Sequence, residues 1–255
     1  MPNWGYAEAP LVEGDKVLCT PGGQKGAVVA LNRKTGELLW QSKELTDVAH
    51  YSSLIAETVF GQRQVIQLTA ASVAGISLAD GKMLWRAVRP GKTAVVPTPV
   101  YADNQVFVTS GYGLGCNAFK ISKGAEGFKA VQIYDNKNMV NHHGGVILFN
   151  GHVYGFSDGK GWVCQDFKTG EIAWANPGVG KGSIAYADGC FYIRSQDGNG
   201  TVALIEATPK GYVEKGRFDQ ADRSNKKSWP HPAIVNGKLY LRDQGTLLCY
   251  DIKGK

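Results

Sequence analysis

The sequence "VVALNRKTGELLW" (residues 28–40) recurs as "VAGISLADGKMLW" (residues 73–85) and "WVCQDFKTGEIAW" (residues 162–174). Each copy has an apolar run, a Thr-Gly or Asp-Gly turn, and a second run that ends in tryptophan. The first two of these tryptophans are 45 residues apart, and the next gap is 89 residues, close to twice that spacing. A regular period of this length indicates a repeat protein in which every copy is one structural unit.

Three further segments complete the repeat. Residues 115–134 have a longer turn and no tryptophan, residues 200–218 end in phenylalanine, and residues 245–255 stop before the second run. Every copy is preceded by an apolar strand, a Gly/Asp/Asn turn and an alternating strand, which is the pattern of a β-hairpin. A complete unit is therefore four short antiparallel strands.

A single four-stranded sheet cannot bury both of its faces, so neighbouring units must stack face to face. Radial stacking of such sheets produces a β-propeller. We therefore predict an all-β fold, a single β-propeller domain over residues 1–255, with units at about 5–40, 50–85, 94–134, 142–174, 181–218 and 229–255. A long two-sheet sandwich is the competing architecture, but it does not predict six similar units at a near-constant period.

The units resemble the PQQ-like β-propeller family, whose repeat reads roughly ALDxxTGxxxW. The residues that carry the resemblance are Ala30-Leu31-Asn32, Thr35-Gly36, Trp40, Asp166, Thr169-Gly170 and Trp174, with a weaker copy at Ser77, Asp80-Gly81 and Trp85. The resemblance covers essentially the whole chain and implies that Trp40, Trp85 and Trp174 pack between adjacent blades. Members of this family typically have about eight blades. The six units are thus part of a larger ring, or a six-bladed ring that residues 1–6 close.

The resemblance implies two classes of function. One branch of the family comprises quinoprotein dehydrogenases, which hold pyrroloquinoline quinone (PQQ) and calcium on the propeller axis. The other comprises non-catalytic members, such as the outer-membrane assembly lipoprotein, which bind partners through loops. Both work outside the cytoplasm, so we expect a periplasmic or otherwise extracytoplasmic location. Residues 1–10 lack the basic and apolar regions of a signal peptide, and no apolar run is long enough to cross a membrane.

Composition excludes other classes of partner. The net charge of +6 comes from 28 basic and 22 acidic residues, and the basic residues are scattered rather than clustered. We therefore expect no nucleic-acid partner. The five cysteines include no CxxC pair, which argues against zinc-knuckle and thioredoxin-like sites. We expect the cysteines to serve as small buried side chains.

Residues just before the innermost strand of each unit should emerge at one mouth of the central channel. Those with side chains suited to binding a ligand or partner are His50, Tyr51, Asn141, His142, His143, Trp229 and His231. A histidine here can equally be a structural plug that hydrogen-bonds exposed backbone groups. We predict no metal site, because the three units involved are remote from one another in a ring. Gly144 and Gly145 should let crowded backbones meet near the axis.

Arg194 and Arg242 occupy matching places after the second strand of their units. Each precedes a turn acid or amide, so an internal charge-assisted bond to Asp197 or Asp243 is expected. If the two guanidinium groups face the channel instead, they would favour an anionic ligand such as a quinone carboxylate.

No catalytic residues can be assigned. A quinoprotein dehydrogenase needs calcium ligands and a carboxylate base, and near the expected mouth only Glu8 and Asn141 offer oxygen ligands. A binding protein needs only varied loops on a rigid ring, and the long insertions at residues 42–53, 122–129 and 218–232 are expected to be such loops. We therefore favour a non-catalytic scaffold that binds a protein partner or a small polar ligand. The alternative is a PQQ-dependent alcohol dehydrogenase with PQQ and calcium.

Overall fold

The computed structural model describes residues 2–253, which form strands, turns and loops without a helix. Six antiparallel sheets follow one another along the chain, five with four strands and the last with three. The all-β fold and its four-stranded antiparallel blades are thus confirmed. The sheets form two compact units, one up to Lys137 and the other from Asn138, with three sheets each. Within residues 2–253 there is no helix long and apolar enough to span a membrane.

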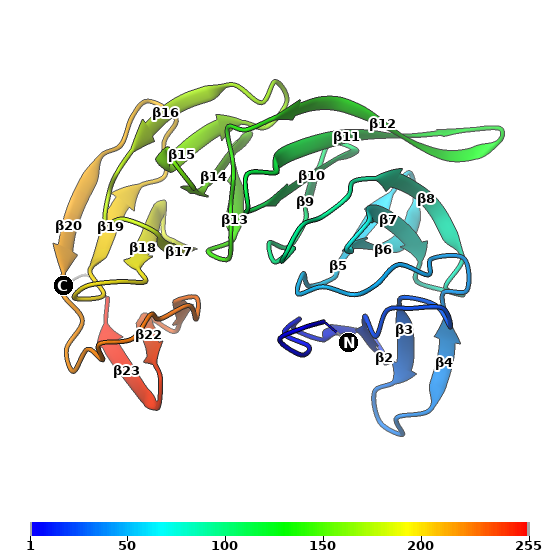
Figure 1. The fold of residues 1–255 in the computed structure, drawn as a ribbon, viewed down its shortest axis with the longest axis horizontal. Helices are drawn as coiled ribbons and strands as arrows, with labels where there is room; N and C mark the ends of the chain where they lie inside the picture. Colours follow the sequence, from blue (N-terminus) through cyan, green and yellow to red (C-terminus); the bar gives the residue numbers. More distant parts are fainter. Residues whose placement is uncertain (1, 254–255) are drawn as a thin grey trace. The chain divides into compact units, whose positions relative to one another are not determined.

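The first unit contains the sheets β1–β4, β5–β8 and β9–β12 (Figure 1). Each is a meander in which consecutive strands pair antiparallel. The strands are β1 (Leu11–Glu13), β2 (Lys16–Cys19), β3 (Val29–Asn32), β4 (Leu38–Gln41), β5 (Ile55–Val59), β6 (Gln62–Leu68), β7 (Ser72–Ser77), β8 (Met83–Val88), β9 (Val100–Ala102), β10 (Gln105–Ser110), β11 (Gly115–Gly124) and β12 (Gly127–Asn136).

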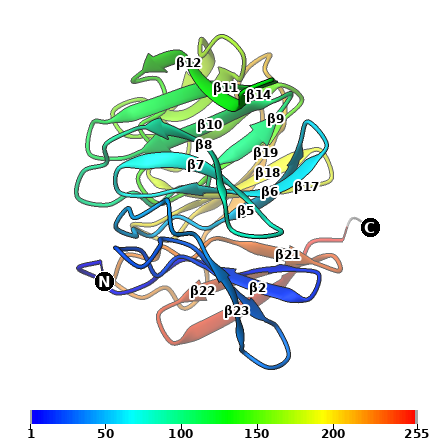
Figure 2. The ribbon, with the colours of Figure 1, turned by 90° about the vertical axis from the view of Figure 1, so that its right-hand side faces the viewer.

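The second unit contains the sheets β13–β16, β17–β20 and β21–β23, the last drawn in red and orange (Figures 1 and 2). The strands are β13 (Val146–Phe149), β14 (His152–Ser157), β15 (Gly161–Asp166), β16 (Ile172–Asn176), β17 (Gly182–Ala187), β18 (Cys190–Ser195), β19 (Val202–Glu206), β20 (Glu214–Phe218), β21 (Ala233–Val235), β22 (Lys238–Asp243) and β23 (Thr246–Asp251).

A two-residue turn joins the first two strands of every sheet. In five of the six turns both central residues have positive φ, which matches the twist of an antiparallel pair. Asn150-Gly151 and Asn236-Gly237 are typical, because both residue types tolerate this conformation. Phe60 is the unusual residue type at such a turn position. It has φ 48°, and its ring lies 6.4 Å from that of Phe128.

The Asn/Asp and Thr-Gly residues of the repeat build the turn between the third and fourth strands. Asp166 Oδ1 accepts hydrogen bonds from the backbone amides of Lys168 and Thr169, both at 2.8 Å. Gly170 follows with φ 77°, a conformation that glycine adopts without strain. A β-bulge then shifts the register between Cys164 and Gln165, and the other four-stranded sheets carry a bulge at the matching place. The motif therefore starts the outermost strand through interactions between neighbouring residues.

The repeat tryptophans lie where one sheet meets the next. Trp40 Nε1 donates to the Leu78 carbonyl, 3.1 Å away in the second sheet, and its ring fills the space where a side chain at Gly81 would lie. Trp174 Nε1 donates to the Thr208 carbonyl in the following sheet at 2.8 Å. The indoles of Trp40 and Trp174 therefore join the outer strand of one sheet to a turn of its neighbour.

Within each unit, apolar cores fill the spaces between neighbouring sheets. In the first unit, Leu18 packs with Ile76, and Trp85 packs with Val106 of the third sheet. In the second unit, Val202 of β19 packs against Leu239 of β22. Burial of these side chains supplies most of the driving force for stacking.

The insertion at residues 122–129 is part of a long hairpin and not the expected loop. Strands β11 and β12 are ten residues each and turn at residues 125–126 (Figure 1). Lys123 lies over the Phe128 ring at 5.1 Å, and β12 also contacts β8 of the preceding sheet. In the third sheet, this long hairpin stands where other sheets have the turn that leads to the repeat tryptophan.

Trp85→Phe tests the polar anchor of the repeat tryptophan. The indole of Trp85 is buried, and its Nε1 donates to Gln64 Oε1 at 2.7 Å. Phenylalanine keeps the apolar packing but leaves a buried amide oxygen without its donor, so we expect a loss of about 1–3 kcal/mol in urea unfolding. The control Trp4→Phe changes an exposed ring and should cost less than about 0.5 kcal/mol. Equal effects of the two substitutions would contradict an anchoring role.

Candidate functional site

The segment Asn141–Gly145 lies just before β13 and forms a tight, fixed turn. Asn141 is fully buried; its Oδ1 accepts from the Gly145 amide at 3.1 Å, and its Nδ2 donates to the carbonyls of Gly145 and Phe156 at 3.0 and 2.9 Å. A Cβ at Gly144 would meet the Gly182 carbonyl oxygen at 1.8 Å. Gly144 thus allows the backbones of two neighbouring sheets to meet, as the sequence indicated.

His142 accepts a hydrogen bond from a lysine. Lys181 Nζ lies 3.1 Å from His142 Nδ1 and forms an ion pair with Asp158 Oδ1 at 2.6 Å. Because the lysine donates, the lone pair of His142 Nδ1 accepts this hydrogen bond, and the proton of the neutral imidazole is on Nε2. Burial, followed by the charge of Lys181, lowers the pKa of His142 below its ordinary value. His142 is therefore neutral at pH 7.

His143 is also held in one neutral form. Its Nε2 lies 2.7 Å from Gln196 Oε1, and the Gln196 amide is oriented by its Nε2 donating to Asp197 Oδ2 at 2.8 Å. His143 must therefore donate from Nε2. Burial lowers the pKa of His143 to about 4. Its Nδ1 is buried and has no hydrogen-bond partner among residues 2–253, so it presents an unused acceptor.

Trp229 covers this pair. Its Nε1 donates to the same Gln196 Oε1 at 3.1 Å, and its ring lies 5.6 Å from the His143 ring. His231 Nε2 donates to the His143 carbonyl at 2.9 Å. Although the indole is tied down on one side, 57% of Trp229 is exposed. The result is a rigid aromatic surface, which we call the Trp229 platform, formed by Lys226, Lys227, Trp229 and His231.

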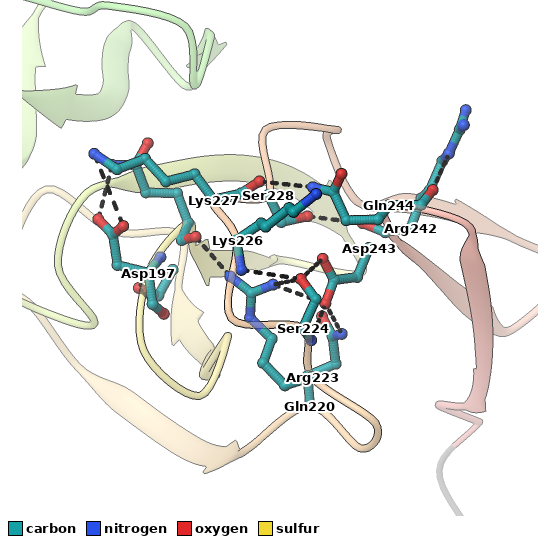
Figure 3. A network of polar contacts seen from close by, with 12 residues as sticks. Asp197, Gln220, Arg223, Ser224, Lys226, Lys227, Ser228, Arg242, Asp243 and Gln244 are labelled. Carbon is teal, nitrogen blue, oxygen red and sulfur yellow. Dashed lines mark hydrogen bonds and ion pairs between the residues drawn. The ribbon is translucent and has the colours of Figure 1, made fainter.

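A buried polar network fixes the loop that carries the platform (Figure 3). Arg223 Nη1 forms an ion pair with Asp243 at 2.7 Å, and the backbone amide and hydroxyl of Ser224 donate to the same carboxylate at 2.7 and 2.8 Å. Burial alone would raise the pKa of Asp243, but hydrogen bonds from Arg223 and Ser224 outweigh it and hold the pKa at about 2. Arg223 Nη2 also donates to the Gln196 carbonyl at 2.7 Å. The loop is therefore anchored to both β22 and the end of β18.

A groove of about 440 Å³ lies beside the platform. Its lining residues are Lys227, Trp229, Pro230, Arg242, Gln244 and Gly245. Gln244 Nε2 donates to the Lys227 carbonyl at 3.0 Å, which ties one wall of the groove to the other. Lys227 and Arg242 are exposed, so the groove combines an indole face with positive charge.

The two arginines are not equivalent. Arg194 is buried; its Nη1 donates to the Arg242 carbonyl at 2.8 Å, and its Nη2 donates to Gln220 Oε1. Arg242 is exposed, and its guanidinium donates from Nε to the nearby Gln244 carbonyl at 3.0 Å. The expected bonds to Asp197 and Asp243 are absent from the described contacts, because Asp243 pairs with Arg223 instead.

His50 and Tyr51 lie in the first unit. His50 Nδ1 accepts the Val95 amide at 3.1 Å, and burial lowers the pKa of this histidine. Tyr51 is buried, and its hydroxyl accepts the Trp4 amide at 3.3 Å. The structure thus brings together Asn141, His142, His143, Trp229 and His231 within the second unit. Convergence of His50 and Tyr51 with them stays a prediction.

Sequence reasoning missed several members of the site. Asp158, Gln196, Arg223 and Asp243 connect segments 19–53 residues apart in the chain. The one available signal was the shared "Q" after the matching arginines, at Gln196 and Gln244. This glutamine marks the end of a blade to which the following loop of the chain forms hydrogen bonds.

Comparison with known proteins places this architecture in a family. Residues 5–176 match the family described as "Outer membrane protein assembly factor BamB". The chain belongs to this family. The match covers more than half of the sequence: nearly all of the first compact unit and the first part of the second.

Among solved structures, BamB from Moraxella catarrhalis has a TM-score of 0.67 at 17% identity, covering 94% of this chain and 67% of that one. The computationally designed Ika8 protein has a TM-score of 0.71 at 12% identity, with 96% and 70% covered. The Cps50 (Swd1) β-propeller domain of Myceliophteria thermophila has a TM-score of 0.61 at 12% identity, with 96% and 85% covered. At these identities the likeness supports the β-propeller fold alone.

A curated relative, tetrathionate hydrolase of Acidithiobacillus ferrooxidans, is 27% identical over 218 residues. The alignment covers 73% of this chain and 39% of the relative. The chain therefore matches about two fifths of the length of that protein.

The site does not fit the PQQ and calcium of the dehydrogenase branch of PQQ-like propellers. Calcium needs six to eight oxygen ligands, whereas here Asn141 Oδ1, Gln196 Oε1 and Asp158 Oδ1 already accept internal hydrogen bonds. No cluster of three or more His, Cys, Asp or Glu within residues 2–253 has a metal-binding arrangement. The donors around the Trp229 platform are mainly nitrogen groups, which suit an anionic or carbonyl-bearing partner better than a cation.

His143→Gln tests the neutral histidine of this propeller. The unfolded chain takes up a proton near the ordinary pKa of 6.5, whereas folded His143 stays neutral down to about pH 4. His143 therefore favours the folded state fully above pH 6.5, and its contribution falls as the pH drops towards 4. We expect wild-type unfolding free energy to fall by roughly 2 kcal/mol between pH 7 and pH 5 because of this group.

Urea unfolding at several pH values measures this slope. His143→Gln should reduce this slope. An unchanged slope in His143→Gln would mean that His143 is not held neutral in the folded protein.

Proposed function

We propose that this chain is a non-catalytic scaffold whose Trp229 platform binds a protein partner. The observation that carries the proposal is the exposed indole of Trp229, which is held in place by Gln196 and by the buried Arg223–Asp243 pair beneath its loop. Exposed aromatic side chains on rigid supports are typical anchors of protein interfaces. Because the platform is fixed before binding, little conformational entropy is lost when a partner docks.

Charge indicates the chemistry of the partner. Lys226, Lys227 and Arg242 are exposed around Trp229, and the nearest acid to Lys227 is Asp197 at 3.9 Å. Positive charge of this kind favours an acidic segment and speeds its association. An acidic segment with an aromatic or proline ring to pack on Trp229 fits the platform best.

Membership of the BamB family supports a scaffold role and an extracytoplasmic location, because the family is described as an outer-membrane protein assembly factor. The side-chain oxygens of Asn141, Asp158 and Gln196 already accept internal hydrogen bonds, which argues against the dehydrogenase alternative. Membership of the family supports a scaffold role, and the Trp229 platform is the surface that we propose for binding.

Site-specific photo-crosslinking in the cells that make the protein tests the proposal. A photo-crosslinking amino acid in place of Lys226 should give one discrete protein adduct, and Trp229→Ala should reduce its yield at least tenfold by removing an interface anchor. Trp229→Phe, which keeps a ring, should retain part of it. Asp243→Asn keeps the residue Trp229 but weakens the bonds that hold its loop, so it should also reduce the adduct yield.

A photo-crosslinker in place of Lys210, an exposed turn residue of the same unit, is the matched control. Adduct yields that Trp229→Ala leaves unchanged, or the same adducts from Lys210, would reject the platform as the binding surface. A rise of several degrees in melting temperature with PQQ plus calcium would instead favour the dehydrogenase alternative, since a tightly bound ligand stabilises the folded state.

A further inference from the structure

Two features of the first unit depart from the pattern of the repeat. The first is Phe60, with φ 48° in the turn between β5 and β6. Asparagine and aspartate tolerate this conformation, whereas in a bulky residue it is strained. The matching residue of four other sheets is of the tolerant kind: Asp103, Asn150, Asp188 and Asn236. The second departure is the long hairpin at residues 122–129 of the third sheet.

The two departures meet in space. The Phe60 ring lies 6.4 Å from the ring of Phe128 in the long hairpin, and Lys123 Nζ of the same hairpin lies 5.1 Å from the Phe128 ring. The contact leaves Phe60 43% exposed, and Lys123 is exposed as well. Burial of the Phe60 ring therefore offsets only part of the backbone strain. Strained residues that packing does not explain are concentrated at functional sites.

A groove of about 490 Å³ lies at this meeting point, and we call it the Phe60 groove. Three sheets of the first unit supply its lining, which consists of Lys16, Phe60, Gly61, Gln62, Arg63, Ser77, Leu78, Ala79 and Lys123. Three of these residues are basic, and no acidic residue of the described chain lines the groove. Its volume is within the range of clefts that bind small ligands or short segments.

Internal hydrogen bonds fix the lining segment around Leu78. The Leu78 amide donates to the Arg63 carbonyl at 3.2 Å, and the Leu78 carbonyl accepts Trp40 Nε1 at 3.1 Å. The main chain of the second sheet is thus tied to the repeat tryptophan of the first. Because this part of the groove is formed before binding, little conformational entropy is lost there when a ligand docks.

The basic side chains of the groove retain donors for a ligand. Arg63 binds Glu13 Oε1 from Nε and Nη2, at 2.9 and 2.7 Å, and its Nη1 has no partner among residues 2–253. Lys123 forms no ion pair within the part of the chain that the structure describes. Lys16 pairs with its exposed neighbour Asp15 at 3.0 Å, a type of contact that contributes little to stability. The groove can therefore receive negatively charged groups.

We propose that the Phe60 groove binds a short acidic peptide segment that carries one aromatic or aliphatic side chain. Carboxylates of the segment pair with Arg63 Nη1, Lys16 and Lys123, and its apolar side chain packs on the exposed ring of Phe60. Because the lining is basic, a neutral or basic segment is disfavoured. The Phe60 groove belongs to the first unit and the Trp229 platform to the second, so this is a binding site beyond the proposed function.

Fluorescence anisotropy with a labelled synthetic peptide tests the proposal. The peptide is a run of glutamates with one central phenylalanine. The full chain carries Trp229→Ala, so that peptide held at the platform does not contribute, and this chain is the parent for all comparisons. Arg63→Gln and Lys123→Gln each remove one positive charge, and each should weaken binding about fivefold or more. Replacing the glutamates of the peptide by glutamines should weaken binding about tenfold or more.

Phe60→Asn separates a binding role from a structural one. Asparagine is the residue found at the matching positions of Asn150 and Asn236, so it fits the turn without strain. Binding should weaken about fivefold or more, while the melting temperature stays at or above that of the parent. Unchanged binding would mean that Phe60 only packs against the hairpin, and would overturn the proposal. If the melting temperature falls, Lys123→Gln decides, because its exposed side chain can be changed without unpacking the turn.

Lys43→Gln is the matched control, since it removes an exposed lysine of the same unit that does not line the groove. Its binding should stay within about twofold of the parent. Equal losses in Lys43→Gln and Lys123→Gln would overturn the proposal, because net charge alone would then attract the peptide. A parent chain that does not bind the peptide would overturn it as well.

The groove and the partner-binding function can fail independently. Lys123→Gln in the otherwise wild-type chain should leave the adduct formed from position 226 in place. Loss of that adduct in Trp229→Ala should in turn leave peptide binding by the Phe60 groove intact.

Discussion

Every part of this structure depends on the inability of one four-stranded sheet to bury both of its faces. Within each compact unit, neighbouring sheets pack face to face, so each of these interfaces joins two repeats of the chain. The indole of Trp40 over Gly81 shows how closely this is fitted, since any side chain at Gly81 would collide with the ring. The requirement for a neighbour explains why tryptophan and glycine recur at fixed places in the sequence.

The local part of the fold could be predicted because its causes are local. Asn150-Gly151 and Asn236-Gly237 adopt positive φ for reasons contained in two residues, and Asp166 organises a turn with residues directly after it. The period of these signals was enough to establish the sheets and their order. The hairpin at residues 122–129 was misjudged as a loop, because Gly124 and Gly127 flank a turn whose strands are longer than in the other units.

The candidate site was predictable only in part. Asn141, His142, His143, Trp229 and His231 were expected to meet because all precede an innermost strand, and the structure does place them together within the second unit. The groups that hold them were not predictable. Their bonds cross between sheets, and no spacing rule within a single repeat reports which loop reaches which blade end.

The site and the packing of the sheets are consequences of the same step in the repeat. Gln196 stands at the end of β18, where the next repeat must cover it, and the covering segment includes Ser228, Trp229 and Arg223. The loop that satisfies Gln196 is thereby locked, and its remaining side chains are presented to solvent in a fixed arrangement. Substitutions that alter this loop will therefore affect both stability and binding unless, like Trp229, they lie on its exposed side. A surface of this kind can change its partner by exchanging exposed residues while the buried bonds beneath it stay the same.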